Sequence, residues 1–292
     1  MTTQSDPPIT APHLPTARRH HVDPDVARTS DRLAALRDRL ERTDLRPGAV
    51  VDAAFGELVG LCCHPPAGCT ERVLARVAPH AHALRTLAST GEGRMEEYWS
   101  ERISRATDPV AELDRFPYLG NYHDLVRLEL AALTALGLAV PHRVVVLGSG
   151  PLPLTGLVLA GRHGADVLHV DRDAASAAAG DAVAAAVGIP ARSLVADLEG
   201  PLPHDLVTEL RRADLVLLGG LVGGDARAKG VITTRLAVAA PGAVQLVRSA
   251  SGLRTLLYPE VTAADLPALD VLLEVHPRTD VVNSVLVARA AA

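Results

Sequence analysis

The pattern of hydrophobic and polar residues divides the chain into two parts. From Val26 to about Leu136, apolar residues recur every three or four positions, as in SDRLAALRDRLERTDL, GAVVDAAFGELVGLC and HDLVRLELAALTALG. This spacing is typical of amphipathic helices and predicts a bundle of about five helices over residues 25–138. Residues 1–24 mix Pro, Thr, Ser and His without periodicity, and we expect them to form a flexible arm.

The pattern changes near Pro141. The short apolar runs VVVLGSG, ADVLHVD, RSLVAD, ADLVLLGG and GAVQLVRSA follow at regular intervals, separated by alanine-rich helical stretches. This alternation predicts βαβ units and a parallel sheet over residues 139–292. The final segment, DVLLEVHPRTDVVNSVLVARA, predicts two strands joined by a short polar turn. We therefore expect an α/β protein in which an N-terminal helical bundle precedes a methyltransferase-type Rossmann domain with a C-terminal antiparallel hairpin.

Composition excludes several classes of partner. A net charge of −5 argues against binding to nucleic acids or anionic membranes, which favour a basic surface. No apolar run reaches the roughly 18 residues that a membrane span needs, and the first residues lack the apolar segment of a signal peptide. Three cysteines suit a reducing compartment better than a disulfide framework. We expect a cytoplasmic protein that acts on a small molecule, and a homodimer is compatible with the sequence.

Gly148 and Gly150 bracket the first predicted strand-to-helix turn, where the backbone can approach a ligand closely. Pro153 stands where the dinucleotide fingerprint has its third glycine, which weakens the interpretation as an NAD site. Asp171 ends the second predicted strand and is placed to hold ribose hydroxyls; Asp197 ends the third and is placed to pair with adenine. Together they predict an adenosine site, with S-adenosylmethionine (SAM) as the natural ligand because no pyrophosphate signature is present.

A second interpretation of these acids is structural. Asp171, Asp173 and Asp197 each precede a predicted helix, and aspartate is a good helix N-cap. Three acids at three successive strand ends favour the adenosine site over three caps. The sequence leaves open whether Asp171 or Asp173 holds the ribose, and we favour Asp171 because it ends the strand.

The motif GSGPLPLT, followed by a strand that ends in Asp-x-Asp, resembles the nicotianamine synthases and their bacterial and archaeal relatives. The resemblance runs from about residue 50 to the C-terminus, through FGELVGLCCHPP, GEGRMEEYWS, FPYLGNYHDLVRLEL, LLGGLVGGD, LVRSASGLRTLLYP and VHPRTDVVNSVLVAR. Residues 1 to about 25 have no counterpart. The stretch LHVDRD departs from plant members, in which aromatic residues often precede the acidic pair.

The resemblance implies a particular reaction. Family members move the 3-amino-3-carboxypropyl arm of SAM onto an amine and release methylthioadenosine. The sulfonium makes each attached carbon electrophilic, so positioning decides which carbon is attacked. By resemblance Glu96 and Tyr122 match the family's catalytic pair: the carboxylate would accept the amine's proton and the phenol would orient the amine. From the residues alone, Glu96 could instead lie on a solvated helix face, as Glu92 and Glu97 could.

We expect SAM to be the substrate, with no metal required. The residues expected to contact it are Gly148, Ser149, Gly150, Pro151, Leu152, Pro153, Thr155, Asp171, Asp173, Asp197 and Gly219.

Three further residues are candidates for substrate binding. A guanidinium suits a substrate carboxylate, so Arg248 and Arg254 are candidates, although each could equally pair with a local acid. Tyr118 is the third candidate, and packing is the alternative role for this residue and for Phe116. The cysteines near residue 63 have irregular spacing interrupted by two prolines, and we expect no zinc site there.

Several functions remain open at this stage. The leading one is transfer of the aminocarboxypropyl group to an amino acid or to a SAM-derived acceptor, in the biosynthesis of a nicotianamine- or opine-type metallophore. In a variant of the same chemistry, SAM's own amine attacks and closes azetidine-2-carboxylate. The alternatives are an ordinary SAM-dependent methyltransferase, which would release S-adenosylhomocysteine, and a non-catalytic SAM- or metal-binding protein.

Overall fold

The computed structural model describes residues 23–291, so all but the last two residues of the predicted arm lie outside it. The Asp23 carboxylate accepts from the Asp25 N–H at 2.9 Å and caps the first helix, which begins at Pro24. The helices before the sheet are α1 (Pro24–Leu40), α2 (Ala49–Cys63), α3 (Thr70–Val77), the 3-10 helix η1 (Ala78–His80), α4 (Ala81–Ser104), α5 (Pro109–Leu113) and α6 (Leu119–Ala135).

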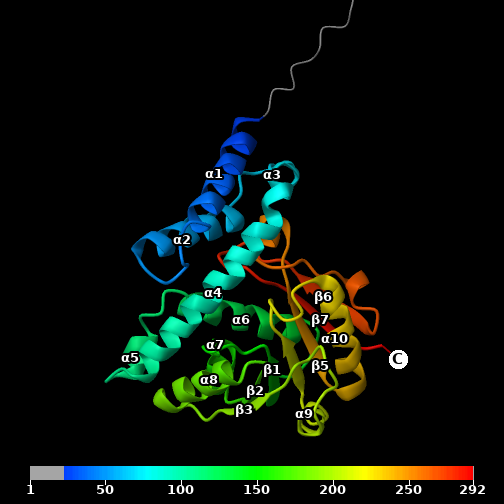
Figure 1. Cartoon of the computed structure of the whole chain (residues 1–292). Coiled ribbons are helices and arrows are strands. Elements are labelled where there is room, and N and C mark those ends of the chain that lie inside the picture. The colour runs from blue at the N-terminus through cyan, green and yellow to red at the C-terminus, as the bar shows by residue number, and fades with distance from the viewer. Residues whose placement is uncertain (1–22, 292) are drawn as a thin grey trace, which may run out of the picture.

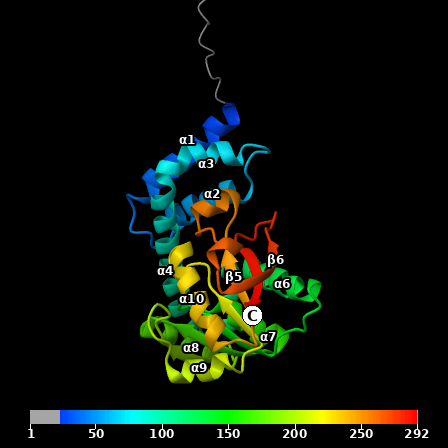
Figure 2. The same cartoon turned by 90° about the vertical axis from the view of Figure 1, so that its right-hand side faces the viewer.

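The helical region has six α-helices rather than about five, and they do not form one bundle. Helices α1 to α3 and the start of α4 share a core around Leu33, Leu58 and Leu84. Helix α6 instead packs its apolar face against the sheet, next to α7 (Leu154–His163). Helix α4 runs from the N-terminal helices down to the sheet, which Figures 1 and 2 show from two sides. The predicted boundary near residue 138 therefore separates α6 from the sheet on which it packs.

The sheet confirms the predicted fold class. Its seven strands follow the order β3-β2-β1-β4-β5-β7-β6, and only β7 runs antiparallel to its two neighbours. The strands are β1 (Arg143–Leu147), β2 (Asp166–Asp171), β3 (Arg192–Val195), β4 (Leu215–Leu218), β5 (Val244–Ser249), β6 (Leu269–Val275) and β7 (Ser284–Ala290). The remaining helices are α8 (Ala174–Ala186), α9 (His204–Leu210), α10 (Ala226–Ala239) and the 3-10 helices η2 (Gly252–Leu256) and η3 (Ala263–Asp265).

Side chains of β1 alternate between two buried faces, which explains its continuous apolar sequence. Val144 and Val146 pack on the face covered by α6 and α7, whereas Val145 and Leu147 pack on the face covered by α9 and α10. Because both faces are covered, ligands can reach the parallel strands only at their ends.

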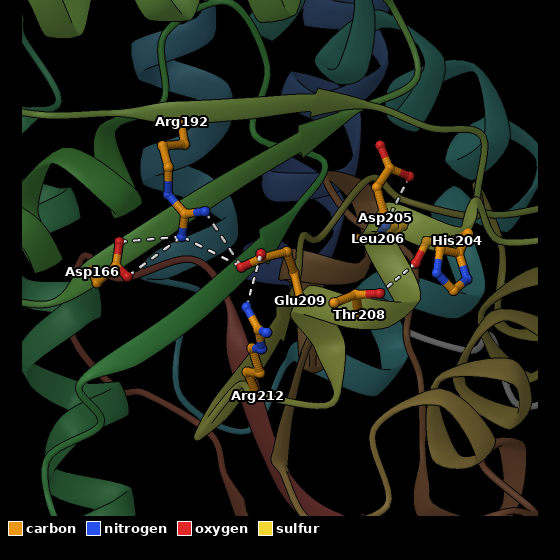
Figure 3. Close-up of polar contacts among 8 residues, drawn as sticks. All are labelled: Asp166, Arg192, His204, Asp205, Leu206, Thr208, Glu209 and Arg212. Atoms are coloured by element: carbon orange, nitrogen blue, oxygen red, sulfur yellow. Dashed lines mark hydrogen bonds and ion pairs between the residues drawn. The ribbon is translucent and has the colours of Figure 1, made fainter.

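Ion pairs link β2, β3 and α9 at the edge where the strands begin (Figure 3). Arg192, at the start of β3, donates to Asp166 at the start of β2 and to Glu209 on α9, at 3.3–3.5 Å. About half of the Arg192 side chain is exposed, so these pairs contribute little to stability. The opposite edge, where the strands end, holds the cavity described below. Within residues 23–291, no helix is long and apolar enough to cross a membrane.

Candidate active site

A cavity of about 1460 Å³ opens at the carboxyl ends of β1, β2 and β4 and is roofed by α2, α4 and α6. Of the residues that the sequence predicts for the site, all except Pro151 and Arg254 line it. The structure thus brings together residues from Glu96 to Arg248. The predicted set on the wall is Glu96, Tyr118, Tyr122, Gly148, Ser149, Gly150, Leu152, Pro153, Thr155, Asp171, Asp173, Asp197, Gly219 and Arg248.

The turn after β1 needs both of its glycines. Gly148 and Gly150 have φ values of +75° and +66°, a region that other residues rarely adopt. A Cβ on Gly150 would lie 2.5 Å from Glu96 Oε2, and one on Gly148 would lie 2.1 Å from a methyl of Val222. The bare backbone therefore lets the carboxylate of α4 reach the turn where a nucleotide-like ligand would bind.

The two acids at the carboxyl end of β2 are held differently. Asp171 accepts from the Gly150 N–H at 2.9 Å and from the Asp173 N–H at 3.0 Å, so it braces the glycine turn. Asp173 caps α8 by accepting from the N–H and hydroxyl of Ser176, and these bonds lower the pKa of Asp173. Asp197, the third predicted acid, accepts from the Glu199 N–H at 3.0 Å.

Glu96 and Tyr122 meet in the cavity, as the resemblance implies. The Tyr122 hydroxyl lies 3.5 Å from Glu96 Oε1, a long hydrogen bond, and Tyr122 is in the first turn of α6. Burial, reinforced by the charges of Glu92 and Asp171, raises the pKa of Glu96 well above its usual range. Burial also raises the pKa of Tyr122, so its phenol stays neutral. Glu96 is thus suited to accept a proton.

The cavity contains a second glutamate–tyrosine pair, Glu92 and Tyr258, that the sequence did not predict. Glu92, treated as a surface candidate, lines the cavity one turn before Glu96, and its Oε2 accepts from the Tyr258 hydroxyl at 2.6 Å. Helical spacing was the available signal, because residues four apart share a face and the exposed Glu97 does not belong to that face. Asn283 was also left out. It is 7% exposed, lines the cavity, and its amide Nδ2 has no hydrogen-bond partner within the described residues.

Arg248 adopts the alternative role considered for it, an ion pair with a local acid. Its Nε donates to Glu129 Oε1 at 2.7 Å and its Nη2 donates to the Thr155 hydroxyl at 2.9 Å. Both charged side chains are buried, so the pair is a structural tie between β5 and α6 at the cavity wall. Lys229 lies just behind this wall and donates to the carbonyls of Gly219 and Arg248, at 2.7 and 3.3 Å.

Arg254 lies outside the cavity wall. Its Nη2 donates to the carbonyls of Thr279 and Cys63, at 2.7 and 3.4 Å, and so ties α2 to the loop before β7. The geometry therefore does not support a contact between Arg254 and a substrate carboxylate. Pro151, also absent from the cavity wall, is buried in the turn. Phe116 packs edge-on against Trp99 and Tyr118, and Tyr118 also lines the cavity.

The charge of the cavity favours a cationic ligand. Nine carboxylates line it against three guanidiniums, one of which is already paired with Glu129. The carboxylates are those of Asp52, Glu92, Glu96, Asp124, Asp171, Asp173, Asp197, Glu199 and Asp280. Within residues 23–291, no three His, Cys, Asp or Glu side chains cluster as a metal site would require, and Cys62, Cys63 and Cys69 are free thiols.

Two solved structures of MtNAS share the fold of this chain. One is in complex with MTA and tNA; it has a TM-score of 0.76 and 19% identity, covering 91% of this chain and 97% of that one. The other is a mutant of MtNAS in complex with S-adenosylmethionine, with a TM-score of 0.76 and 18% identity, covering 90% and 98%. At this identity they establish a shared fold that includes the helices roofing the cavity.

Sequence similarity is stronger for plant proteins. Nicotianamine synthase 2 of Oryza sativa subsp. japonica is 38% identical over 283 residues, covering 91% of this chain and 84% of the relative. Nicotianamine synthase of Solanum lycopersicum is 32% identical over 270 residues, covering 92% and 85%. The family model described as "Nicotianamine synthase protein" matches residues 26–292. The chain belongs to the nicotianamine synthase family.

Proposed function

We propose that the chain moves the 3-amino-3-carboxypropyl group of SAM onto the amine of a second molecule in the same cavity, an amino acid or a SAM-derived unit, to build a nicotianamine- or opine-type metallophore. Membership of the family makes the chain a SAM-using transferase that releases methylthioadenosine. The acceptor, the number of transfers and the metallophore product are the parts that we propose.

The size of the cavity carries this proposal. At about 1460 Å³ it exceeds the roughly 300–1000 Å³ of a pocket for a single small ligand. Its wall extends from Asp197 beyond β3, through the glycine turn, to His64 and Asp280 near the N-terminal helices. There is therefore room for SAM and for a separate acceptor. Cyclisation of SAM to azetidine-2-carboxylate needs only one molecule and would leave much of this space unused.

The proposed residue roles follow from the geometry of the wall. The glycine turn, Asp171 and Asp197 hold the adenosine, and Asp171 rather than Asp173 takes the ribose because Asp173 is committed to its helix. Glu96 Oε2 lies against Gly150, where the amino acid arm of a bound SAM would leave the turn.

The reaction needs one proton acceptor. The ammonium group of the acceptor gives one proton to Glu96, and the lone pair of the resulting amine then attacks the arm carbon bonded to sulfur. As the new N–C bond forms, the C–S bond breaks and its electrons stay on sulfur, which leaves as the neutral thioether. Tyr122, as a neutral phenol, orients the amine. Holding the amine, the arm carbon and Glu96 together lowers the entropic cost of the reaction.

Product analysis tests the proposal directly. The purified protein is incubated with SAM alone and with SAM plus each member of an amino acid panel, and products are identified by mass spectrometry. Methylthioadenosine together with an acceptor enlarged by one or more aminobutyrate units is expected. Methylthioadenosine with azetidine-2-carboxylate from SAM alone would show cyclisation instead, and S-adenosylhomocysteine would show methyl transfer. A cytoplasmic location and a homodimer remain predictions, which fractionation and light scattering would test.

A further inference from the structure

Two half-buried carboxylates face the cavity from one helix. Glu92 and Glu96 are four residues apart on α4, so their side chains lie one turn apart on the same face. The function proposed above uses only Glu96. Placing a second carboxylate this close, away from bulk water, has an electrostatic cost, so its contacts reveal what it does.

The two carboxylates are held in different ways. Glu92 accepts a 2.6 Å hydrogen bond from the Tyr258 hydroxyl, and the positive charge of Arg248 acts on it. Glu96 has only the long contact with the Tyr122 hydroxyl, and its other oxygen faces the glycine turn. Burial raises the pKa of Glu92, whereas the Tyr258 hydrogen bond and the charge of Arg248 oppose that rise, so the Glu92 carboxylate is better compensated than that of Glu96 and is fixed in position. Glu96 is the carboxylate that is free to gain and lose a proton.

We propose that Glu92 is a positioning residue whose negative charge, held in place by Tyr258, makes Glu96 the stronger proton acceptor for the substrate amine. The inference rests on the proposed function, in which Glu96 is the base. An α-amino group has an ordinary pKa of about 7.7–8.0 and a glutamate about 4.3, so an unassisted glutamate is a weak base for this proton. A nearby anion reduces that mismatch, because the negative charge of Glu92 stabilises the protonated form of Glu96.

Two other groups also shift the pKa of Glu96, each by less than Glu92 does. Asp171 also raises the pKa of Glu96, whereas the Tyr122 hydrogen bond lowers it. Arg248, although paired with Glu129, still lowers the pKa of Glu92. The titratable and charged groups that face this part of the cavity, from α4, α6, β2, β5 and the segment after η2, are Glu92, Tyr122, Asp171, Arg248 and Tyr258.

The test is the pH dependence of kcat/KM for methylthioadenosine release, which reports ionisations of the free enzyme. Activity needs ionised Glu96, so it falls as pH is lowered through the pKa of Glu96. In Glu92→Gln the neighbouring charge is gone and the pKa of Glu96 drops. The acid limb should therefore move to lower pH by about one unit, while the activity on the plateau falls because the base is weaker.

Glu97→Gln is the matched control. It makes the same change one residue from Glu96, but the Glu97 side chain is 63% exposed and faces away from the cavity wall. Its acid limb should coincide with that of the wild type. Tyr258→Phe removes only the hydrogen bond to Glu92. The pKa of Glu92 then rises, so Glu92 competes better with Glu96 for a proton. The acid limb of the pH profile should therefore shift in the same direction as in Glu92→Gln, but by less. The double variant of Glu92→Gln and Tyr258→Phe should match Glu92→Gln alone, since Tyr258 acts through Glu92.

The outcomes distinguish a failure of the role proposed for Glu92 from a failure of the proposed function. If the wild type releases no methylthioadenosine, the proposed function fails and the role of Glu92 fails with it. If the wild type is active and the acid limb stays in place in both Glu92→Gln and Tyr258→Phe, the proposed function stands and the role of Glu92 is refuted. Should Glu92→Gln not fold, the shift in Tyr258→Phe decides. A lower plateau with an unmoved limb would indicate a structural role only.

Discussion

Lys229 offers a sharp test of the electrostatics behind the cavity wall. It is the only lysine in the sequence and has no exposed surface. Its amine donates to two backbone carbonyls, but no carboxylate among the described residues pairs with it. Burial, with a smaller effect of the Arg248 charge, lowers the pKa of Lys229 to about 7, against about 10.4 in an unfolded chain.

The sign of the resulting pH dependence follows from proton counting. Below pH 7 both the folded and the unfolded chain carry the proton on Lys229, so its contribution is flat. Between about pH 7 and pH 10 the unfolded chain keeps the proton and the folded chain loses it, so the free energy of unfolding rises with pH. For the pKa given above, the gain between pH 6 and pH 8.5 is about 2 kcal/mol.

The perturbation is Lys229→Met, which keeps the length of the side chain and removes the amine. Losing the bonds to Gly219 and Arg248 costs about 1–3 kcal/mol at every pH. The test therefore depends on how the difference in unfolding free energy changes with pH. The difference in unfolding free energy between wild type and variant should grow by about 2 kcal/mol from pH 6 to pH 8.5. Urea titrations followed by circular dichroism and by the single tryptophan, Trp99, would measure it.

Arg227→Met is the control, since it removes a cation from the exposed side of the same helix, α10. Its difference from the wild type should stay constant with pH. A constant difference for Lys229→Met as well would refute the reasoning, because it would mean that the buried amine keeps its proton throughout this range.

Three further outcomes are expected. Glu96→Gln should keep SAM binding by calorimetry and lose methylthioadenosine release; normal turnover would remove Glu96 from the mechanism. Asp171→Ala should weaken SAM binding by about 1–3 kcal/mol, because it removes a charged partner of the ligand and the brace on Gly150; unchanged affinity would place the ribose contact elsewhere. Arg192→Ala, at the opposite edge of the sheet, should leave kcat/KM unchanged and lower unfolding stability by less than about 1 kcal/mol, since its ion pairs with Asp166 and Glu209 are exposed; a loss of activity would show that the two edges are coupled.

The parts of the site that the sequence predicted depend on local backbone chemistry. Gly148 and Gly150 are recognisable because a tight turn after a strand needs positive φ angles, and both have them. Asp171 was identified from its position at a strand end, about 20 residues beyond the turn, a spacing that the βαβ unit imposes. The hairpin was predictable for the same reason, because two apolar runs separated by a short polar turn can pair only with each other or with a neighbouring strand edge.

The parts that the sequence did not predict depend on contacts between distant residues. Glu92 pairs with Tyr258, 166 residues later, and Arg248 pairs with Glu129 across 119 residues. No periodicity or spacing encodes which of two arginines turns towards an acid and which turns towards carbonyls, so Arg248 and Arg254 looked equivalent. Lys229 gave no signal either, since a single lysine in an arginine-rich chain looks like a bias of composition.

Helix α4 is intermediate between the features that the sequence predicted and those that it did not. Its amphipathic pattern is weak. The face that meets the cavity carries Glu92 and Glu96, where an ordinary buried face would carry apolar residues. A helix that buries carboxylates looks from its sequence like a solvated one, and this is why Glu92 and Glu97 were grouped together. Helix α4 also approaches α2 closely at Gly91, where a Cβ would come within 2.2 Å of the Phe55 ring. The signal in the sequence is the spacing of the acids, because residues 92 and 96 are four apart and share one face of the helix, whereas residue 97 does not fall on that face. In the structure that face lines the cavity.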